Sequence, residues 1–372
     1  MIRRFLNFRK AVISSDLYIM YVGDYSNQIG PPNSMIALAK LLKKKYSLFS
    51  TGNLLLSPQE NGEASVKEKS IISDFRFFLT TTRLKCFLSK IRFVILVLTF
   101  NIKAILARLI NKKIKLVITQ PLLLPLISFE DVFFIKRANL ELMDIGTNNK
   151  IFYLFEKIFV NKKGFKLIYL VQQNYESSCP YSIIPNHFYE SDFEPRDSRA
   201  ESYEFHSVGT WSERKGADLL YEASSSIFSL TKKTLNIYGG LGQDMSLNSQ
   251  LDSKYINYHG VQPSPYNNFC KGDVFLSFSR VEGLQRSLVE ALFMECVIVG
   301  FPRPDILSLQ DYPGVFIIDS DDILNSLTEI VNYLSSLDCQ ERCSLGSSNR
   351  VLAISEFSEE QVIEKWEDLL SK

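Results

Sequence analysis

The sequence has little of what metal sites and disulfide frameworks require. Its 372 residues include only three histidines and six cysteines, and these do not stand at the short paired spacings of metal ligands. The nearest pair, Cys339 and Cys343, lies in a stretch that we expect to be helical. We therefore predict no metal site, and we interpret the cysteines as small core residues or thiols rather than disulfides.

Long apolar runs are missing as well. The longest unbroken stretches, such as 93–98 and 122–127, are far shorter than the roughly 20 residues that a membrane-spanning helix needs. The start of the chain is basic, but neither an apolar core nor a cleavage site follows, so we predict no secretory signal. These absences favour a cytoplasmic protein.

Charge is nearly balanced overall but not along the chain. The formal net charge is +1, yet residues 1–180 hold 27 Lys and Arg against 12 Asp and Glu, and the remainder holds 15 against 29. In the first half, basic residues alternate with apolar ones, as in 83–92 and 102–113. Such segments suit peripheral contact with the anionic inner face of a membrane, although ordinary basic helices of a soluble domain would give the same pattern. Nucleic acid is not expected as a partner, because no recognition motif is present and the acidic half would repel phosphate.

Short apolar segments alternate with helical ones along most of the chain. This alternation predicts an α/β fold with parallel sheets wound on both sides, and the length and the 46% hydrophobic content are sufficient for two cores. Ligands of such sheets bind at the carboxyl ends of the strands, where Gly209, Gly240, Gly260 and Ser279 fall. The predicted strands are 17–23, 46–49, 115–119 and 166–171 in the first half, and 234–240, 255–261, 273–278, 297–300 and 315–319 in the second.

The segment 273–300 is the most informative part of the chain. It predicts a buried strand, a glycine turn, a short helix and a second buried strand, with Glu282 in the turn and Glu290 on the helix. Carboxylates at such places can accept hydrogen bonds from sugar hydroxyls, while the N–H groups at the helix start face an anion. The alternative is a surface helix with two solvated glutamates.

A second segment, 207–223, predicts a strand end, a glycine turn, a basic loop and a helix. The loop contains Arg214 and Lys215, and a cation there would stabilise charge that develops on a departing phosphate. A solvated basic turn is the alternative interpretation.

These two segments resemble those of one enzyme family. Ser279-Arg-Val-Glu282-Gly283-Leu284-Gln285, followed by a helix with Glu290-Ala291, resembles the E-x7-E region of retaining GT-B glycosyltransferases of the family-four type (glycosyl transferases group 1). That region usually begins Ser-x-x-Glu-Gly-Phe-Gly. The segment 207–223 is similar to the stretch that opens the donor domain of the family. Members transfer a sugar from a nucleotide sugar with retention of anomeric configuration.

The resemblance implies roles for individual residues. Glu282 would hold the transferred sugar, Glu290 the donor ribose, and Lys215 the leaving group, with Arg214 substituting for an arginine that the family usually has at the position of Thr210. The resemblance implies no metal or other cofactor, and it implies no separate protein base, because the departing phosphate can take the acceptor proton. Backbone N–H groups near Leu284 and Gln285 would meet the pyrophosphate. The remaining donor-binding candidates are Gly283, Gly209, Thr210, Gly240 and, in the loop after the first strand, Gly30.

The resemblance also implies a domain organisation. We expect an acceptor-binding Rossmann-like domain over 1–188, a nucleotide-sugar-binding one over 189–355 that faces it across a central cleft, and a terminal helix over 356–372 that returns to the first domain. The acceptor would be a glycan or a lipid-pyrophosphate-linked saccharide, in a bacterial surface polysaccharide such as O-antigen or capsule.

Departures from the family pattern leave two alternatives open. Thr210 replaces the usual arginine, Pro31 follows Gly30, and the turn 300–305 differs from the usual Gly-Gly-x-Pro-Glu. The chain could therefore be a catalytically inactive GT-B partner protein. A nucleotide-sugar 2-epimerase also has two wound domains, but its chemistry requires histidine in the cleft, and residues 1–186 contain none.

Overall fold

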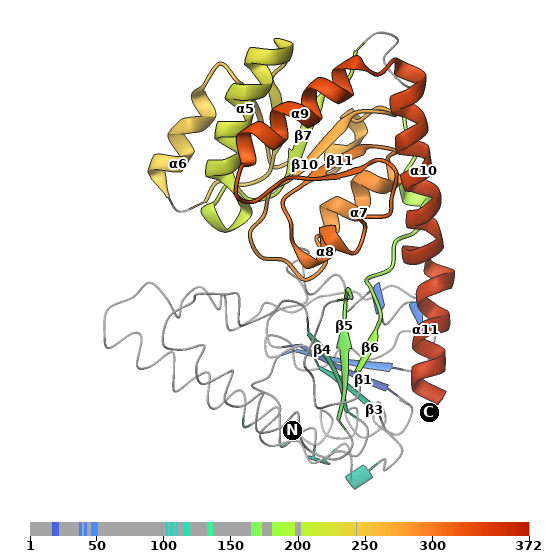
Figure 1. The fold of residues 1–372 in the computed structure, drawn as a ribbon. Helices are drawn as coiled ribbons and strands as arrows, with labels where there is room; N and C mark the ends of the chain where they lie inside the picture. Colours follow the sequence, from blue (N-terminus) through green and yellow to red (C-terminus); the bar gives the residue numbers. More distant parts are fainter. Residues whose placement is uncertain are drawn as a thin grey trace, which may run out of the picture. The chain divides into compact units, whose positions relative to one another are not determined.

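The chain forms two compact units in the computed structural model (Figure 1). Unit 1 comprises Met1–Leu170, Tyr175–Ile184 and Lys365–Lys372, and unit 2 comprises Val171–Asn174 and Pro185–Glu364. The structure describes residues 17–21, 37–38, 41–42, 46–50, 98, 102, 105–106, 109–110, 115–118, 132–136, 165–172, 181–197, 202–242 and 244–371.

Unit 1 is built on a parallel sheet with the strand order β2-β1-β3-β4-β5-β6. The four strands predicted for this half are present, and the sequence-based prediction missed two more, β4 and β6. The first four described residues of β4 are buried, as is usual in a sheet covered on both faces. The strands are β1 (Leu17–Tyr21), β2 (Tyr46–Ser50), β3 (Lys115–Ile118), β4 (Val132–Lys136), β5 (Phe165–Tyr169) and β6 (Tyr181–Ile183).

Unit 2 contains a second parallel sheet, with the order β12-β11-β10-β7-β8-β9. The predicted α/β class with two parallel sheets is therefore confirmed. The neighbours β7 and β10 pair at two positions only, Phe205 with Val274 and His206 with Phe275, and beyond them the Ser207 hydroxyl donates to the Leu276 carbonyl at 3.0 Å. The strands are β7 (Phe205–Val208), β8 (Leu235–Tyr238), β9 (Ile256–Gly260), β10 (Val274–Ser277), β11 (Val297–Gly300) and β12 (Val315–Ile317).

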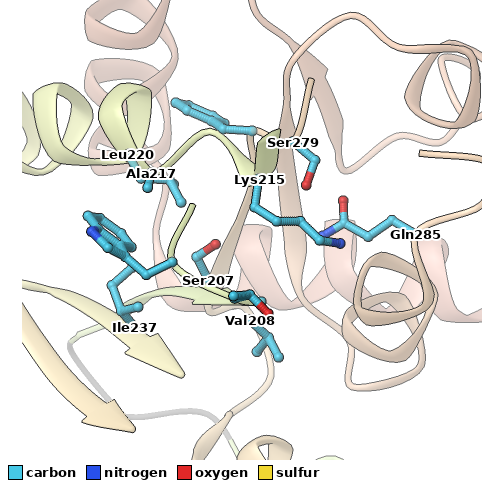
Figure 2. Close-up of a pocket in the computed structure, with 12 residues that line it drawn as sticks. Ser207, Val208, Lys215, Ala217, Leu220, Ile237, Ser279 and Gln285 are labelled. Atoms are coloured by element: carbon cyan, nitrogen blue, oxygen red, sulfur yellow. The ribbon is translucent and has the colours of Figure 1, made fainter. Parts of the chain in front are cut away.

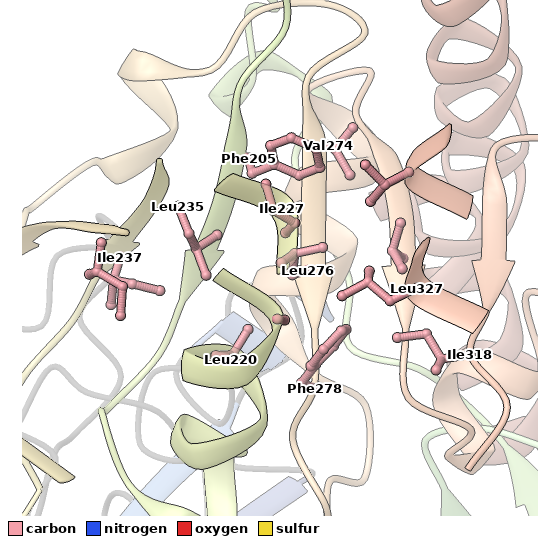
Figure 3. Close-up of a cluster of buried hydrophobic side chains, with 14 of the residues drawn as sticks. Phe205, Leu220, Ile227, Leu235, Ile237, Val274, Leu276, Phe278, Ile318 and Leu327 are labelled. Carbon is pink, nitrogen blue, oxygen red and sulfur yellow. The ribbon is translucent and has the colours of Figure 1, made fainter. Parts of the chain in front are cut away.

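Helices cover both faces of the second sheet (Figure 1). On one face α5 (Ala217–Thr231) packs against α9 (Ile323–Ser336), and on the other α7 (Arg286–Phe293) packs against α10 (Cys339–Phe357). Figure 3 shows the core under α5 and α9, where apolar side chains of the sheet meet those of the helices. Its members include Phe205, Leu220, Ile227, Leu235, Val274, Leu276 and Leu327. The other α-helices in the described part of unit 2 are α6 (Met245–Ser249), α8 (Pro304–Leu307) and the start of α11 (Glu359–Ser371).

The C-terminal end of the chain returns to unit 1. The helix α10 ends at Phe357, whose carbonyl accepts a hydrogen bond from the Phe188 N–H at 2.9 Å, and α11 begins after the single residue Ser358. The last eight residues, Lys365–Lys372, belong to unit 1, where Lys115 Nζ donates to the Leu370 carbonyl. The predicted return of the terminal helix to the first domain is confirmed.

Candidate functional site

The strand order of unit 2 reverses between β7 and β10, and both candidate segments begin there. Strand β7 is followed along the chain by β8, which pairs on one side of it, whereas β10 pairs on its other side and leads outward to β11. Ligands of open parallel sheets bind outside the carboxyl ends of the strands at such a reversal. The loops that leave these two ends, 209–216 and 278–285, carry the predicted residues Lys215 and Glu282.

Two glycines bring the loops of this edge close together. Gly216 has a left-handed φ of +74°, and a Cβ there would lie 2.1 Å from the Phe278 carbonyl oxygen. Gly239 has a φ of +151°, and its Cβ would lie 1.8 Å from the carbonyl oxygen of Gly209. No other residue type fits at these distances. The sequence-based prediction selected Gly240 of the Gly-Gly pair, but the close approach is made by Gly239.

The three predicted catalytic side chains meet in one cluster. Lys215 Nζ donates to Glu282 Oε1, and Arg214 Nη1 lies 3.7 Å from the same oxygen. The Lys215 and Glu282 side chains are 22% and 15% exposed, while that of Arg214 is 52% exposed. The cluster is therefore partly exposed to solvent. It places two cations beside a carboxylate, an arrangement that can bind an anionic group.

A narrow pocket lies at the base of this cluster (Figure 2). The Lys215 side chain extends across it toward Gln285, with Ser279 beside them. Of the predicted donor-binding residues, Gly209, Thr210 and Gln285 also line the pocket, whereas the Leu284 side chain is buried. Gly30 and the loop around it lie outside the described residues.

Glu290 is held by two neighbours from different elements. Its Oε2 accepts a hydrogen bond from the Tyr266 hydroxyl, and its Oε1 accepts one from Arg286 Nε at 2.7 Å. Burial raises the pKa of the Glu290 carboxyl, against the opposing effects of Arg286 and Tyr266. Burial and the nearby carboxylate also raise the pKa of Tyr266 well above its usual value. The Glu290 side chain is only 14% exposed.

A buried ion pair supports the loop that carries Glu282. Arg303 and Asp305 are 2% and 0% exposed, with 3.0 Å between Arg303 Nε and Asp305 Oδ1. Asp305 Oδ2 accepts the backbone N–H of Gln285 at 3.1 Å, so that N–H is not available to a phosphate while this bond holds. Arg303 also donates to the Gln285 side chain at 2.8 Å. The sequence-based prediction noted the unusual turn 300–305 but did not foresee this role.

The histidines of unit 2 have different environments. His259 stacks on Tyr238 with 4.5 Å between ring centroids and lies 2.9 Å from Asn236 Oδ1. His187 is buried, and its Nε2 has no hydrogen-bond partner among the described residues. Burial and the charge of Arg286 lower the pKa of His187 to about 4.

The part of the chain that the structure describes contains no group of His, Cys, Asp and Glu side chains arranged to hold a metal ion. Within it, no helix combines the length and the apolar character needed to cross a bilayer.

Residues 203–336 match the sequence profile of the family Glycosyl transferases group 1. This stretch lies within unit 2 and is what the chain shares with the group 1 glycosyltransferases. The matched stretch includes the loops with Lys215 and Glu282 and the helix with Glu290, so the site described above lies within it. The group 1 glycosyltransferases are a retaining family. No curated protein sequence is similar enough to the chain to count as a relative.

Several solved structures are similar to the chain in fold. Sucrose-phosphate synthase from Thermosynechococcus elongatus is 13% identical, with a TM-score of 0.70 over 96% of this chain and 98% of that protein. HepE from Anabaena, in complex with UDP and glucose, is 13% identical, with a TM-score of 0.62 over 96% of this chain and all of HepE. S. aureus TarM, in a complex that includes UDP, is 16% identical, with a TM-score of 0.55 over 70% of this chain and 56% of TarM. The chain thus spans little more than half the length of TarM, and these likenesses show the GT-B fold.

Proposed function

We propose that the protein transfers a sugar from a nucleotide-sugar donor to an acceptor hydroxyl with retention of anomeric configuration. The observation that carries this proposal is the cluster of Lys215, Arg214 and Glu282 at the strand-order reversal of unit 2, within the stretch that matches the group 1 glycosyltransferases. Two cations beside a carboxylate suit a ligand that joins a diphosphate to a polyhydroxylated sugar.

The chemistry follows from the charges of this cluster. As the bond between the anomeric carbon and the diphosphate oxygen breaks, negative charge builds up on that oxygen, and Lys215 and Arg214 stabilise it. Glu282 accepts hydrogen bonds from hydroxyls of the transferred sugar and keeps the cations in place. The acceptor oxygen forms the new bond on the same face of the sugar, and its proton passes to the departing phosphate oxygen. The products are the glycoside and the nucleoside diphosphate.

The donor and acceptor are part of the same proposal. HepE complexes contain UDP and UDP-glucose, so a UDP-sugar is the first donor to test. For the acceptor we propose a glycan or a lipid-linked saccharide of a bacterial surface polysaccharide, such as O-antigen or capsule. The reaction would then take place at the cytoplasmic face of the membrane.

Exposed apolar side chains in unit 1 support peripheral membrane contact. Five helical residues between 98 and 109 are 38% to 70% exposed, at the spacing of one helix face, and the segment 102–113 is rich in Lys and Arg. They are Leu98, Ile102, Ile105, Leu106 and Leu109.

Membrane contact is tested by vesicle sedimentation. The wild type is expected to sediment with phosphatidylglycerol vesicles, and the Leu109→Glu variant is expected to remain in the supernatant. As a control, Val351→Glu changes a similarly exposed residue of unit 2. Equal sedimentation of all three proteins would argue against the contact.

The donor site is tested by a thermal-shift panel of UDP-, GDP- and dTDP-sugars. One nucleotide class should stabilise the wild type, and Glu290→Gln should remove most of that stabilisation while still offering an acceptor to Tyr266. Glu329→Gln, on the exposed surface of α9, is the matched control. Stabilisation that survives Glu290→Gln would remove Glu290 from the donor site.

Turnover separates the proposed transferase from the alternatives. Glu282→Ala and Lys215→Ala should each lower kcat by roughly 10²–10⁴-fold at unchanged melting temperature. Release of a free sugar epimer would support an epimerase. Absence of both donor binding and donor hydrolysis would support an inactive partner protein.

A further inference from the structure

Four arginines lie on the loops and helix starts at the carboxyl edge of the second sheet, and two of them are committed to structural pairs. Arg280 donates to both oxygens of Asp218, at 2.7 and 2.5 Å, and Arg303 is buried with Asp305. The other two, Arg214 and Arg286, are about half exposed, at 52% and 46%. Each of them pairs with one of the two glutamates of the E-x7-E region.

Arg286 occupies a position that helix electrostatics alone would not favour. It is the first residue of α7, and the first turn of this helix contains no acidic residue. The N-terminal end of a helix carries partial positive charge, so a cation there opposes the helix dipole. The Ser287 hydroxyl donates to the Val208 carbonyl at 3.1 Å. This bond holds the start of α7, with its partial positive charge and Arg286, at the end of β7 beside the strand-order reversal.

The Arg286 side chain covers one oxygen of Glu290. Its Nε donates to Oε1, and its guanidinium lies 4.7 Å from the Phe188 ring centroid. The other oxygen, Oε2, is bound by the Tyr266 hydroxyl, so Oε1 is the oxygen whose partner is the half-exposed Arg286. A hydroxyl group that is to bind Glu290 must therefore share or displace the contact with Arg286.

We propose that Arg286 is a diphosphate-binding residue of the donor site and that it masks Glu290 until a diphosphate draws it away. This inference rests on the proposed function, because it takes the ligand to be a nucleoside diphosphate. An anion at the start of α7 offers Arg286 a charge-assisted, bidentate contact and leaves Oε1 of Glu290 open to the ribose hydroxyls. Recognition of the diphosphate and recognition of the ribose are thereby coupled.

This coupling sets Arg286 apart from a residue that only positions Glu290. A positioning residue would support the binding of every ligand that uses Glu290, with or without phosphates. A masking residue opposes a ligand that has the ribose but lacks the diphosphate. The nucleoside and the nucleoside diphosphate should therefore respond differently to its removal.

The test compares UDP with uridine by isothermal titration calorimetry, with GDP and guanosine and dTDP and thymidine as further pairs. Arg286→Gln should weaken binding of the diphosphate about 10–100-fold and should leave nucleoside binding unchanged or stronger. Arg286→Lys, which keeps the charge but loses the planar fork, should fall between the wild type and Arg286→Gln. Arg280→Gln removes an arginine of the same edge and should leave the ratio of the two affinities unchanged.

Three results would overturn the proposal in distinguishable ways. Equal weakening of nucleoside and diphosphate in Arg286→Gln would make Arg286 a positioning residue only. An unchanged affinity for both ligands would remove it from the site. Failure of the wild type to bind any of the three diphosphates would refute the proposed function, and the role of Arg286 would fall with it.

Discussion

The carboxyl edge of the second sheet carries two charged clusters of opposite character. Lys215, Arg214 and Glu282 are partly exposed and contact one another through long, adjustable side chains. Arg303 and Asp305 are almost fully buried. A partly exposed cation can exchange its partner for a ligand, whereas a buried pair that loses a partner leaves an uncompensated charge. Under the proposed function, the first cluster acts on the ligand and the second maintains the geometry of the first.

The bonds of the buried cluster show how it maintains that geometry. Arg303 Nη1 donates to the carbonyls of Ser277, at 3.1 Å, and Ser279, at 2.6 Å, and Asp305 accepts the N–H of Gln285. These residues are the end of β10, the start of its loop and the N-cap of α7. Glu282 lies on the short segment between them, so its position depends on Arg303 although the two side chains need not touch.

Breaking the buried pair is the strongest test of this contrast. Arg303→Met should lower the free energy of unfolding by about 3–5 kcal/mol, because Asp305 is left charged in the interior. The matched control is Arg280→Met, which breaks the partly exposed pair with Asp218 and should change it by less than about 1 kcal/mol. Urea unfolding of both variants measures the difference. Similar losses in the two would show that burial does not distinguish the pairs.

Gly239 and Gly240 allow a similar comparison for the backbone, between a tightly packed position and an open one. In Gly239→Ala the new Cβ would clash with the carbonyl of Gly209, and we expect a loss of about 3 kcal/mol in the free energy of unfolding. In Gly240→Ala the nearest atom is at an ordinary 3.6 Å, so we expect a change within about 0.5 kcal/mol. Thermal unfolding of the pair tests this order. A reversed order would mean that the close approach of the loops is not required.

The smallest effect on the free energy of unfolding is expected for His187, and only at acidic pH. Its pKa of about 4 in the folded protein lies below the ordinary 6.5, so the unfolded chain takes up the proton first as the pH falls. The stability contributed by neutral His187 is therefore present above pH 6.5 and is lost toward pH 4. Between pH 7 and pH 5 the loss should be about 2 kcal/mol. His187→Phe, which keeps an aromatic ring against Tyr189, should reduce the pH dependence of urea unfolding by that amount. An unchanged dependence would contradict the assignment to His187.

The sequence predicts the exposed cluster better than the buried one. Lys215 and Glu282 are 67 residues apart, but each follows an apolar strand, and parallel strands bring their carboxyl ends to one edge. The Arg303–Asp305 pair could not be predicted in this way, because a charged residue two positions from another is ordinarily solvated. Its burial depends on how the turn after β11 packs under the loop of β10, which is a tertiary property. The hydrogen bond from Tyr266 to Glu290 escaped prediction for the same reason.

Some features of the fold could not be predicted from the sequence either. Strand β4 lies outside the segments that carry the family resemblance, and its apolar run Val132–Ile135 is short enough to belong to either a strand or a buried helix. The choice between Gly239 and Gly240 depends on which of them faces the Gly209 carbonyl. Neither periodicity nor turn propensity contains that information.

The short pairing between β7 and β10 affects which sequence changes this sheet can accept during evolution. Because the two strands share a backbone ladder only at Phe205–Val274 and His206–Phe275, their ends are joined by the Ser207 hydroxyl rather than by main-chain pairing. Insertions and substitutions in the loops that follow β7 and β10 need not disturb the register of the sheet. These loops can therefore vary in sequence while the layer of Phe205, Val274 and Leu276 continues to specify the same fold.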